Sequence, residues 1–376
     1  MQLTVSGMLN QFHRILQGVL FPALDEQLGP LSDKHRQLAA VLSMIEIEGL
    51  VACWPGGVGR PARHRRAIAR AFVAKAVFHL NATRQLLDRL SVDVSLRRIC
   101  GWESRREIPH ESQFSRAFAE FAASELPQRL HEALIQATQQ ERLIGHISRD
   151  STEIEAREKP LRAPVSITPA KSMRKRGRPK KGEPSLPPGP TRLERQAAMT
   201  LEPMLDDLPR ASNAGSKKNS QGYKLHLDVA DGQIPISCIL TSASLHDSQA
   251  AIPLARMTAQ RVTHLYALMD SAYDARLIHE QVRGLGQIPI IDVHPRRDAQ
   301  QKAELHAEAK RRKLLNFNFA EEARYRERTA VERVNARLKD EFGGRMVRVR
   351  GNAKAMCHPM FGIVALAADR ILRLIA

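Results

Sequence analysis

One stretch near the carboxyl end, residues 325–339 (YRERTAVERVNARLK), sets the strongest condition on the fold. It contains no helix breaker, and most of its residues favour a helix. At about 100° per residue, four polar side chains fall within an arc of roughly 60°: Tyr325, Arg328, Glu332 and Lys339. A separate stripe is apolar: Val331, Val334 and Leu338. The rest of the chain must therefore supply a core on which this apolar stripe packs, with the polar stripe directed away from it.

The polar stripe has two interpretations. The ordinary one is a solvated helix face with an i,i+4 ion pair between Arg328 and Glu332. The pattern Tyr-x2-Arg-x3-Glu-x6-Lys also resembles the signature around the last catalytic acid of bacterial insertion-sequence transposases of the DDE class, and all four residues match at that spacing. The resemblance implies that Glu332 is the third acid of a site whose first two acids are aspartates at strand ends.

The first aspartate is expected near residue 150. The segment GHISRDSTEIEA alternates like a strand and becomes polar toward its end, so Asp150 is predicted to lie just past a central strand. An aspartate in a turn after a strand would look the same. Four residues reproduce the setting of the first catalytic aspartate in the resembled family: Ile147, Asp150, Thr152 and Ile154. Glu153 and Glu155 remain alternatives for this position.

The second aspartate is expected at the end of the segment HLYALMD, where Asp270 follows an apolar run suited to a buried strand. The resembled family has Asp-x-Gly-Tyr-Asp here, and this chain has Ala272 in place of the glycine. Asp274 is predicted to cap the helix that follows, and Asp292, after a further short strand, is a weaker candidate.

Between these aspartates the sequence predicts a hairpin. Residues 219–230 and 234–244 alternate like strands and are joined through Asp-Gly, a turn signal. His246 and Asp247 follow and have a counterpart in the resembled family, which implies a supporting or DNA-contacting role. A helix N-cap at Asp247 would explain that residue equally well.

The order strand–acid, hairpin, strand–acid, helix–acid resembles an α/β RNase H-like core, in which helices flank a mixed five-stranded sheet. The resemblance therefore implies a catalytic domain over residues 141–376. Residues 1–140 are expected to be helical and to bind DNA ends or mediate oligomerisation. Within them, a helix beginning near residue 111 and carrying Gln113, Ser115 and Arg116 is compatible with a helix-turn-helix.

The charge of the chain points to a polyanionic partner. It has 58 Lys and Arg against 40 Asp and Glu, a net charge of +18, and such an excess favours nucleic acid. Residues 157–209 lack hydrophobic periodicity and are predicted to be a low-complexity insertion. Its basic residues either follow DNA phosphates or, around Arg-Gly-Arg-Pro, resemble an AT-hook: Arg174, Lys175, Arg176, Arg178, Lys180 and Lys181.

The resemblance implies two Mg²⁺ ions, with Mn²⁺ able to substitute, held by Asp150, Asp270 and Glu332 for DNA cleavage and strand transfer. Tyr325, Arg328 and Lys339 would contact the DNA. The implied partners are double-stranded DNA, as terminal inverted repeats and as target, and a second copy of the chain on that DNA.

The sequence shows no membrane partner, because the apolar run at residues 360–368 is too short to span a bilayer. The scattered cysteines suit a cytosolic protein with reduced thiols, and the resemblance implies a bacterial protein associated with the nucleoid. Two alternatives remain: a DNA-binding repressor or domesticated relic without catalysis, and a simple RNase H-like endonuclease.

Overall fold

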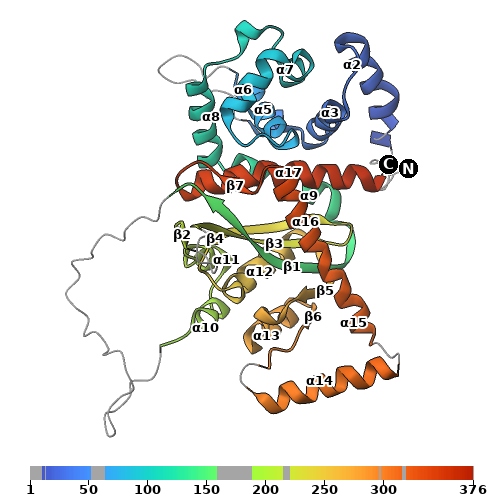
Figure 1. Cartoon of the computed structure of the whole chain (residues 1–376), viewed down its shortest axis with the longest axis vertical. Coiled ribbons are helices and arrows are strands. Elements are labelled where there is room, and N and C mark those ends of the chain that lie inside the picture. Colours follow the sequence, from blue (N-terminus) through green and yellow to red (C-terminus); the bar gives the residue numbers. More distant parts are fainter. Residues whose placement is uncertain are drawn as a thin grey trace, which may run out of the picture.

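The computed structural model describes residues 11–12, 14–51, 64–158, 189–214, 221–295, 298–315 and 319–375. The six basic residues from Arg174 to Lys181 that the sequence marks as DNA contacts lie outside these ranges. Figure 1 shows a helical amino-terminal region above a sheet, with one long helix running between the two.

The amino-terminal region is built from short helices, some of which end at polar caps or glycines. Ser32 opens one helix by accepting a hydrogen bond from the backbone amide of His35, and Gly101 closes another with a φ of 104°. Such capping satisfies the free backbone groups at helix ends. The helical elements before the sheet are η1 (Leu16–Leu20), α2 (Phe21–Leu28), α3 (Asp33–Ile45), α4 (Ile47–Leu50), α5 (Arg65–Val77), α6 (Thr83–Val92), α7 (Val94–Cys100), η2 (Arg105–Glu107), α8 (Glu111–Ala123) and α9 (Leu126–Gln139).

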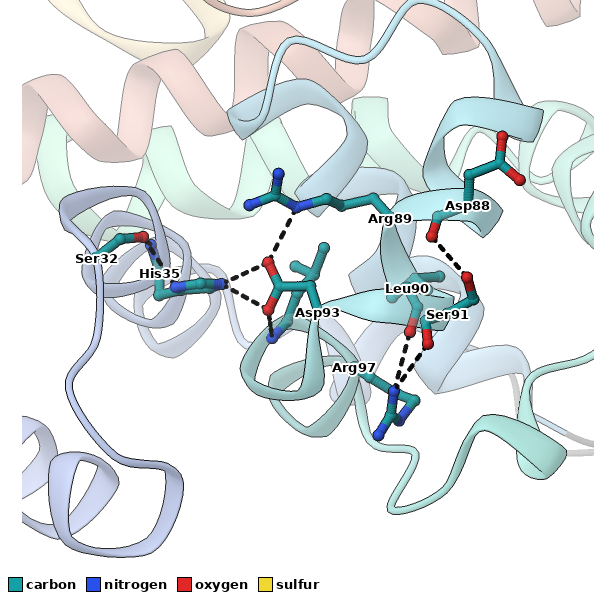
Figure 2. A network of polar contacts seen from close by, with 9 residues as sticks. Ser32, His35, Asp88, Arg89, Leu90, Ser91, Asp93 and Arg97 are labelled. Carbon is teal, nitrogen blue, oxygen red and sulfur yellow. Dashed lines mark hydrogen bonds and ion pairs between the residues drawn. The ribbon is translucent and has the colours of Figure 1, made fainter.

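One carboxylate, that of Asp93, ties three of these helices together (Figure 2). It accepts from the Leu96 amide at the start of α7, from Nε2 of His35 on α3 at 3.1 Å, and from Nε of Arg89 on α6 at 3.0 Å. Burial alone would raise the pKa of Asp93, but the Leu96 amide, His35 and Arg89 outweigh it and lower that pKa. The carboxylate is therefore held in its charged form at the junction of α3, α6 and α7.

The predicted helix beginning near residue 111 is α8, and Phe114, Phe118 and Phe121 on it are buried. Gln113, Ser115 and Arg116 are exposed. The helix-turn-helix interpretation is wrong, because the connection between the two helices is too long: α7 ends at Cys100 and α8 begins only at Glu111. A helix-turn-helix connects its helices through three or four residues.

The sheet has seven strands, counted over the described residues, and mixes parallel and antiparallel pairs. Its long strands give the spatial order β4-β3-β1-β5-β6, with β1 in the centre. β1 runs antiparallel to β3 and parallel to β5. The prediction of five strands missed two short ones at the margins, β2 and β7. The strands are β1 (Leu143–Ala156), β2 (Asn213–Ala214), β3 (Gln221–Ala230), β4 (Ile234–Ser242), β5 (Thr263–Met269), β6 (Ile288–Ile291) and β7 (Met346–Val347).

The predicted hairpin is confirmed as β3 and β4. Gly232 and Gln233 form its turn with φ values of 79° and 62°, and the Gln233 amide donates to the Ala230 carbonyl at 3.0 Å. A positive φ at the first of these positions suits glycine, which has no Cβ. The turn fixes the register of β3 against β4, in which Leu227 lies opposite Cys238, and β3 pairs on its other side with β1, where Leu227 lies opposite Asp150.

The carboxyl-terminal helix α17 (Asn352–Ile375) is the centre of the core. Figure 1 shows it running between the amino-terminal helices and the sheet, and it contacts α3, α5, α8 and α9 as well as β4. By length and composition it could cross a membrane, but 78% of its most apolar window is buried within the fold. The predicted core helix is confirmed, and one apolar cluster joins residues from Leu38 to Ile371.

The remaining helices lie around the sheet. Part of the predicted low-complexity insertion is folded, because α10 and α11 lie within it and bury Gln196 and Met204. Figure 1 shows α14 at the end of the molecule farthest from the amino-terminal helices. These elements are α10 (Arg192–Ala197), α11 (Leu201–Asp206), η3 (Asp247–Ala250), α12 (Ala251–Arg261), η4 (Ser271–Tyr273), α13 (Arg276–Gly284), α14 (Ala299–Leu314), α15 (Ala320–Tyr325), η5 (Arg326–Arg328) and α16 (Thr329–Asp340).

Candidate active site

Two aspartates lie level with each other on neighbouring parallel strands. β1 and β5 pair with Ser148 opposite Leu268, and extending this register by two residues places Asp150 opposite Asp270. Asp270 has extended backbone angles and so continues the line of β5. Residues level on parallel strands about 4.8 Å apart point to the same face of a sheet. The two carboxylates therefore share one face at the end of the β1–β5 ladder.

The prediction that Asp150 follows the end of its strand is wrong in detail. β1 continues to Ala156, so Asp150 lies in its middle, at the point where pairing with β5 stops and pairing with β3 goes on. Glu153 and Glu155, the alternatives, lie farther along β1 opposite Lys224 and Gly222.

The electrostatics of Asp150 reflect this position. Burial, together with the neighbouring charge of Asp270, raises the pKa of Asp150 to about 6, although the Ser151 amide and Arg328 oppose the rise. The like charge of Asp270 on the adjacent strand disfavours the ionised form of Asp150, and a cation between the two carboxylates would relieve the repulsion.

Residues 325–339 are helical throughout, but they are not one regular helix. α15 ends at Tyr325, a 3-10 turn covers Arg326–Arg328, and α16 begins at Thr329. The predicted apolar stripe is confirmed, because Val331, Val334 and Leu338 are buried and α16 packs on β1 and β3. Of the polar stripe, Glu332 and Lys339 thus lie on α16, which is fixed to the sheet, while Tyr325 and Arg328 come just before it.

Arg328 links the helix to the sheet. Its Nη2 atom donates to Oε1 of Glu332 at 2.7 Å, which is the i,i+4 pair of the ordinary interpretation. Burial alone would lower the pKa of Arg328, but Tyr325, Glu332 and Asp150 outweigh it and raise that pKa. The guanidinium thus interacts with acids on both sides, Glu332 on the helix and Asp150 on the strand.

Tyr325 is held by an acid that the sequence placed among the weaker candidates. Its hydroxyl donates at 2.7 Å to Oδ2 of Asp292, the residue directly after β6. Burial and this carboxylate raise the pKa of Tyr325. Asp292 therefore anchors the end of α15, just before the 3-10 turn. Lys339 lies two turns beyond Glu332 on the same side of α16.

The other face of β1 carries a buried ion pair next to Asp150. Arg149 donates through Nε and Nη2 to both carboxylate oxygens of Asp228 at 2.7 Å, and Nη1 donates to the Ala251 carbonyl at 3.0 Å. Thr258 also donates to Asp228 at 2.6 Å. This pair was not predicted from the sequence, because Arg149 and Asp228 lie on different strands, 79 positions apart, and no local pattern connects them.

One interpretation predicted that Asp247 is a helix N-cap, and this prediction is wrong. His246 is the N-cap instead, through an Nδ1 atom that accepts from the Ser248 amide, while Asp247 accepts from Nζ of Lys224 at 2.9 Å and from the Ser151 hydroxyl at 2.8 Å. The predicted cap at Asp274 is also wrong: its carboxylate contacts His279 at 3.3 Å and accepts from the His294 amide.

A residue that the sequence analysis did not assign, Tyr273, completes the surroundings of the aspartates. It is 1% exposed, and its hydroxyl has no hydrogen-bond partner among the described residues. Burial and the charges of Asp247, Asp150 and Asp270 raise its pKa well above the usual range. Its place within the Asp-x-x-Tyr-Asp motif was the only signal in the sequence.

The donors fit Mg²⁺ at two of the three predicted positions. Asp150 and Asp270 supply carboxylate oxygens, the ligands this ion prefers, from one face of the sheet. Glu332 is turned toward Arg328, and in the described part of the chain no three acids, histidines or cysteines already lie at metal-binding spacing. A metal site that included Glu332 would require it to exchange Arg328 for the ion.

Comparison with family models decides the identity of the chain. The model described as Transposase DDE domain matches residues 144–367, more than half of the chain. The chain belongs to the DDE transposase family. The model described as Transposase domain (DUF772) matches residues 24–120 of the same transposase. No curated protein and no solved structure matches it.

The resemblance of the sequence to insertion-sequence DDE transposases is thereby confirmed. Membership implies an RNase H-like core, a nuclease or transposase type of enzyme, DNA as partner and dependence on a divalent metal. The two matched segments meet in space, because α17 of the transposase's DDE segment packs on α5 and α8 of the helical one.

Proposed function

We propose that this transposase binds the inverted repeats at the ends of an insertion sequence, cuts the DNA there and joins the cut ends to target DNA. The observation that carries this proposal is the placement of Asp150 level with Asp270, faced by the Arg328–Glu332 pair. Oxygen donors and a guanidinium are the groups that phosphoryl transfer on DNA requires.

Each residue of the site has a role that follows from its position. Asp150, Asp270 and Glu332 are the proposed ligands of two Mg²⁺ ions, with Mn²⁺ able to substitute. When bound, such a pair of ions activates the attacking water or 3′-hydroxyl and stabilises the leaving oxygen. Arg328, released from Glu332, is placed to donate two hydrogen bonds to a phosphate of the cut strand.

The neighbouring residues keep this arrangement in place. Tyr325 holds the end of α15 against Asp292, and Lys339 adds a further cation along α16. Asp247 is braced by Lys224 and by Ser151, which follows Asp150 on β1. We therefore assign Asp247 a supporting role beside the two catalytic aspartates, and His246 the role of ordering the turn that carries it.

The two regions of the chain divide the work. We infer that residues 1–140 bind the element ends and mediate pairing of two copies on DNA. Residues 141–376 form the catalytic domain, with the β4-β3-β1-β5-β6 order corresponding to a five-stranded RNase H-like sheet. The basic residues from Arg174 to Lys181 add contacts to duplex DNA in this proposal.

The test is a cleavage assay on duplex DNA carrying the native flanks of the coding region. With Mg²⁺, wild type should nick specifically at the element ends and transfer the strands, and Glu332→Gln should lose both steps. The matched control is Glu327→Gln, which changes an exposed acid five residues earlier. Cutting without end specificity or joining would indicate an endonuclease, and binding of the flanks with no cutting in Mg²⁺ or Mn²⁺ would indicate a repressor or relic.

A further inference from the structure

A pocket of about 480 Å³ lies between the helical region and the carboxyl-terminal part of the chain, away from the acids of the active site. Its walls come from α5 and α8 on one side and from the end of β1, β7 and the start of α17 on the other. Figure 1 shows α8 descending to the end of α17 beside β7. The pocket therefore opens at the junction of the two segments that the family models match.

Cations dominate the rim of this pocket. Arg157, Arg348, Arg350 and Lys354 line it and are exposed, and no Asp or Glu is among its lining residues. Within the described ranges, these four side chains make no hydrogen bond or ion pair. Glu158, next to Arg157, is engaged elsewhere, since it accepts from the Tyr223 hydroxyl at 2.8 Å and the Gly351 amide at 3.0 Å.

The floor of the pocket adds a buried cation. Lys75 is 7% exposed, and its Nζ atom lies 3.3 Å from Nδ1 of His358, whose Nε2 atom lies 3.1 Å from the Gly343 carbonyl oxygen. Burial and the charge of Arg348 lower the pKa of Lys75 to about 8. The amino-terminal end of α17, which carries a partial positive charge, lies at the same rim through Lys354.

This arrangement contrasts with the rest of the described surface, where many arginines pair with acids, as Arg65 does with Glu120 and Arg142 with Asp231. Cations kept close together without counter-charges repel one another, and an anion between them removes that cost. Phosphate oxygens suit this set, because guanidinium groups donate to them in pairs.

We propose that this pocket binds backbone phosphates of duplex DNA and thereby clamps the DNA at the junction of the helical region and the catalytic core. The occupant is duplex DNA because the cations form an exposed rim along two segments, residues 348–354 and Arg157, that a continuous backbone can follow. This inference rests on the proposed function for its partner, and it adds a binding site outside the acids.

The test is the salt dependence of DNA binding. Each phosphate contact contributes about 0.9 to the slope of log K against log salt. The pocket variant Arg348→Gln, Arg350→Gln, Lys354→Gln should therefore bind more weakly, with a slope smaller by roughly two to three. The control Lys302→Gln, Lys310→Gln, Lys313→Gln removes the same charge from exposed positions on α14 and should keep the wild-type slope within about half a unit.

The experiment uses the full chain and two duplexes, one with the native flanks and one of unrelated sequence. Both variants should have the melting temperature of wild type, because the substituted side chains are exposed. If the triple variant unfolds, the single variant Arg350→Gln replaces it, with an expected change in the salt slope of about one. Equal slopes for wild type and pocket variant, or equal losses in pocket and control variants, would overturn the inference.

A further arm separates DNA from small phosphates. Pyrophosphate alone is titrated into wild type and pocket variant by calorimetry. If the pocket variant loses pyrophosphate binding but keeps the full DNA slope, the site takes a small phosphate and the DNA assignment is wrong. Failure of wild type to prefer the native flanks would refute the proposed function. In that case the difference in salt slope between wild type and pocket variant on the unrelated duplex still tests whether the pocket binds DNA.

Discussion

The two faces of β1 carry the same kinds of charge in opposite circumstances. On one face, Arg149 and Asp228 are 2% and 0% exposed in their side chains, and their charges are matched by each other, Ala251 and Thr258. On the other, Asp150 lies beside Asp270, and the nearby Arg328–Glu332 pair has side chains that are 20% and 50% exposed. We call the first face, on which the charges of Arg149 and Asp228 are paired within the protein, the complete face. We call the second face, on which Asp150 and Asp270 lie side by side, the open face.

This difference indicates what each face does. A bidentate, fully bonded ion pair in the core holds β1, β3 and α12 in one arrangement and leaves little capacity for another partner. Two adjacent carboxylates and a partly exposed arginine cost stability and retain capacity for a cation and a phosphate. In the proposed function, the neighbouring residues Arg149 and Asp150 on one strand serve the fold and the chemistry separately.

The largest expected effect on stability comes from breaking the Arg149–Asp228 ion pair on the complete face. Arg149→Met should lower the free energy of unfolding by about 3–5 kcal/mol, because it leaves the buried Asp228 charge without its partner. The matched control is Arg142→Met, which breaks an ion pair with Asp231 whose side chains are 42% and 27% exposed; its cost should stay below about 1 kcal/mol. Urea denaturation measures both, and equal costs would contradict the contrast between the faces.

The next effect has the opposite sign. Because burial and Asp270 raise the pKa of Asp150 to about 6, the folded protein without metal binds this proton more tightly than the unfolded chain does. The group therefore costs stability above pH 6, and this cost disappears as the pH falls from about 6 toward 4. Asp150→Asn should stabilise the metal-free protein at pH 7.5 by roughly 1–3 kcal/mol, with little change near pH 4.

Thermal unfolding in the presence of a chelator, followed across that pH range, checks this prediction. The variant should also be inactive, so that stability and activity change in opposite directions. A destabilised Asp150→Asn at pH 7.5 would mean that the carboxylate is a structural partner on the open face.

The smallest effect is expected at the pair that faces the aspartates. Glu332→Gln removes one charge from a partly exposed i,i+4 pair, which contributes only about 0.3–0.5 kcal/mol. Its melting temperature should match that of Glu327→Gln within about 2 °C. A large loss of stability in Glu332→Gln alone would show that Arg328 and Glu332 form a structural clamp like Arg149 and Asp228.

The elements of the fold could be predicted where periodicity is strong. The hairpin at Asp231-Gly232, the strand before Asp270 and the buried stripe of Val331, Val334 and Leu338 follow from alternation, a turn signal and helical spacing. The carboxyl-terminal core helix was predicted in the same way. Each of these features is local, and local patterns are what a single sequence records.

Features that depend on distant partners could not be predicted. The true end of β1 depends on β3 and β7, which keep it paired to Ala156 beyond the polar residues that resemble a strand end. Asp247 and Asp274 look like helix caps, yet their carboxylates bond Lys224 and the His294 amide. The 3-10 turn at Arg326–Arg328 occurs in residues that all favour a regular helix.

The central claim is that the open face of β1 holds metal ions through Asp150, Asp270 and Glu332. Titration of the full chain with Mn²⁺, followed by electron paramagnetic resonance of the free ion, tests it without any DNA. Wild type should bind Mn²⁺, Asp270→Asn should lose most of that binding, and Glu327→Gln should keep it. Equal Mn²⁺ binding by wild type and Asp270→Asn, or none by either, would contradict the account.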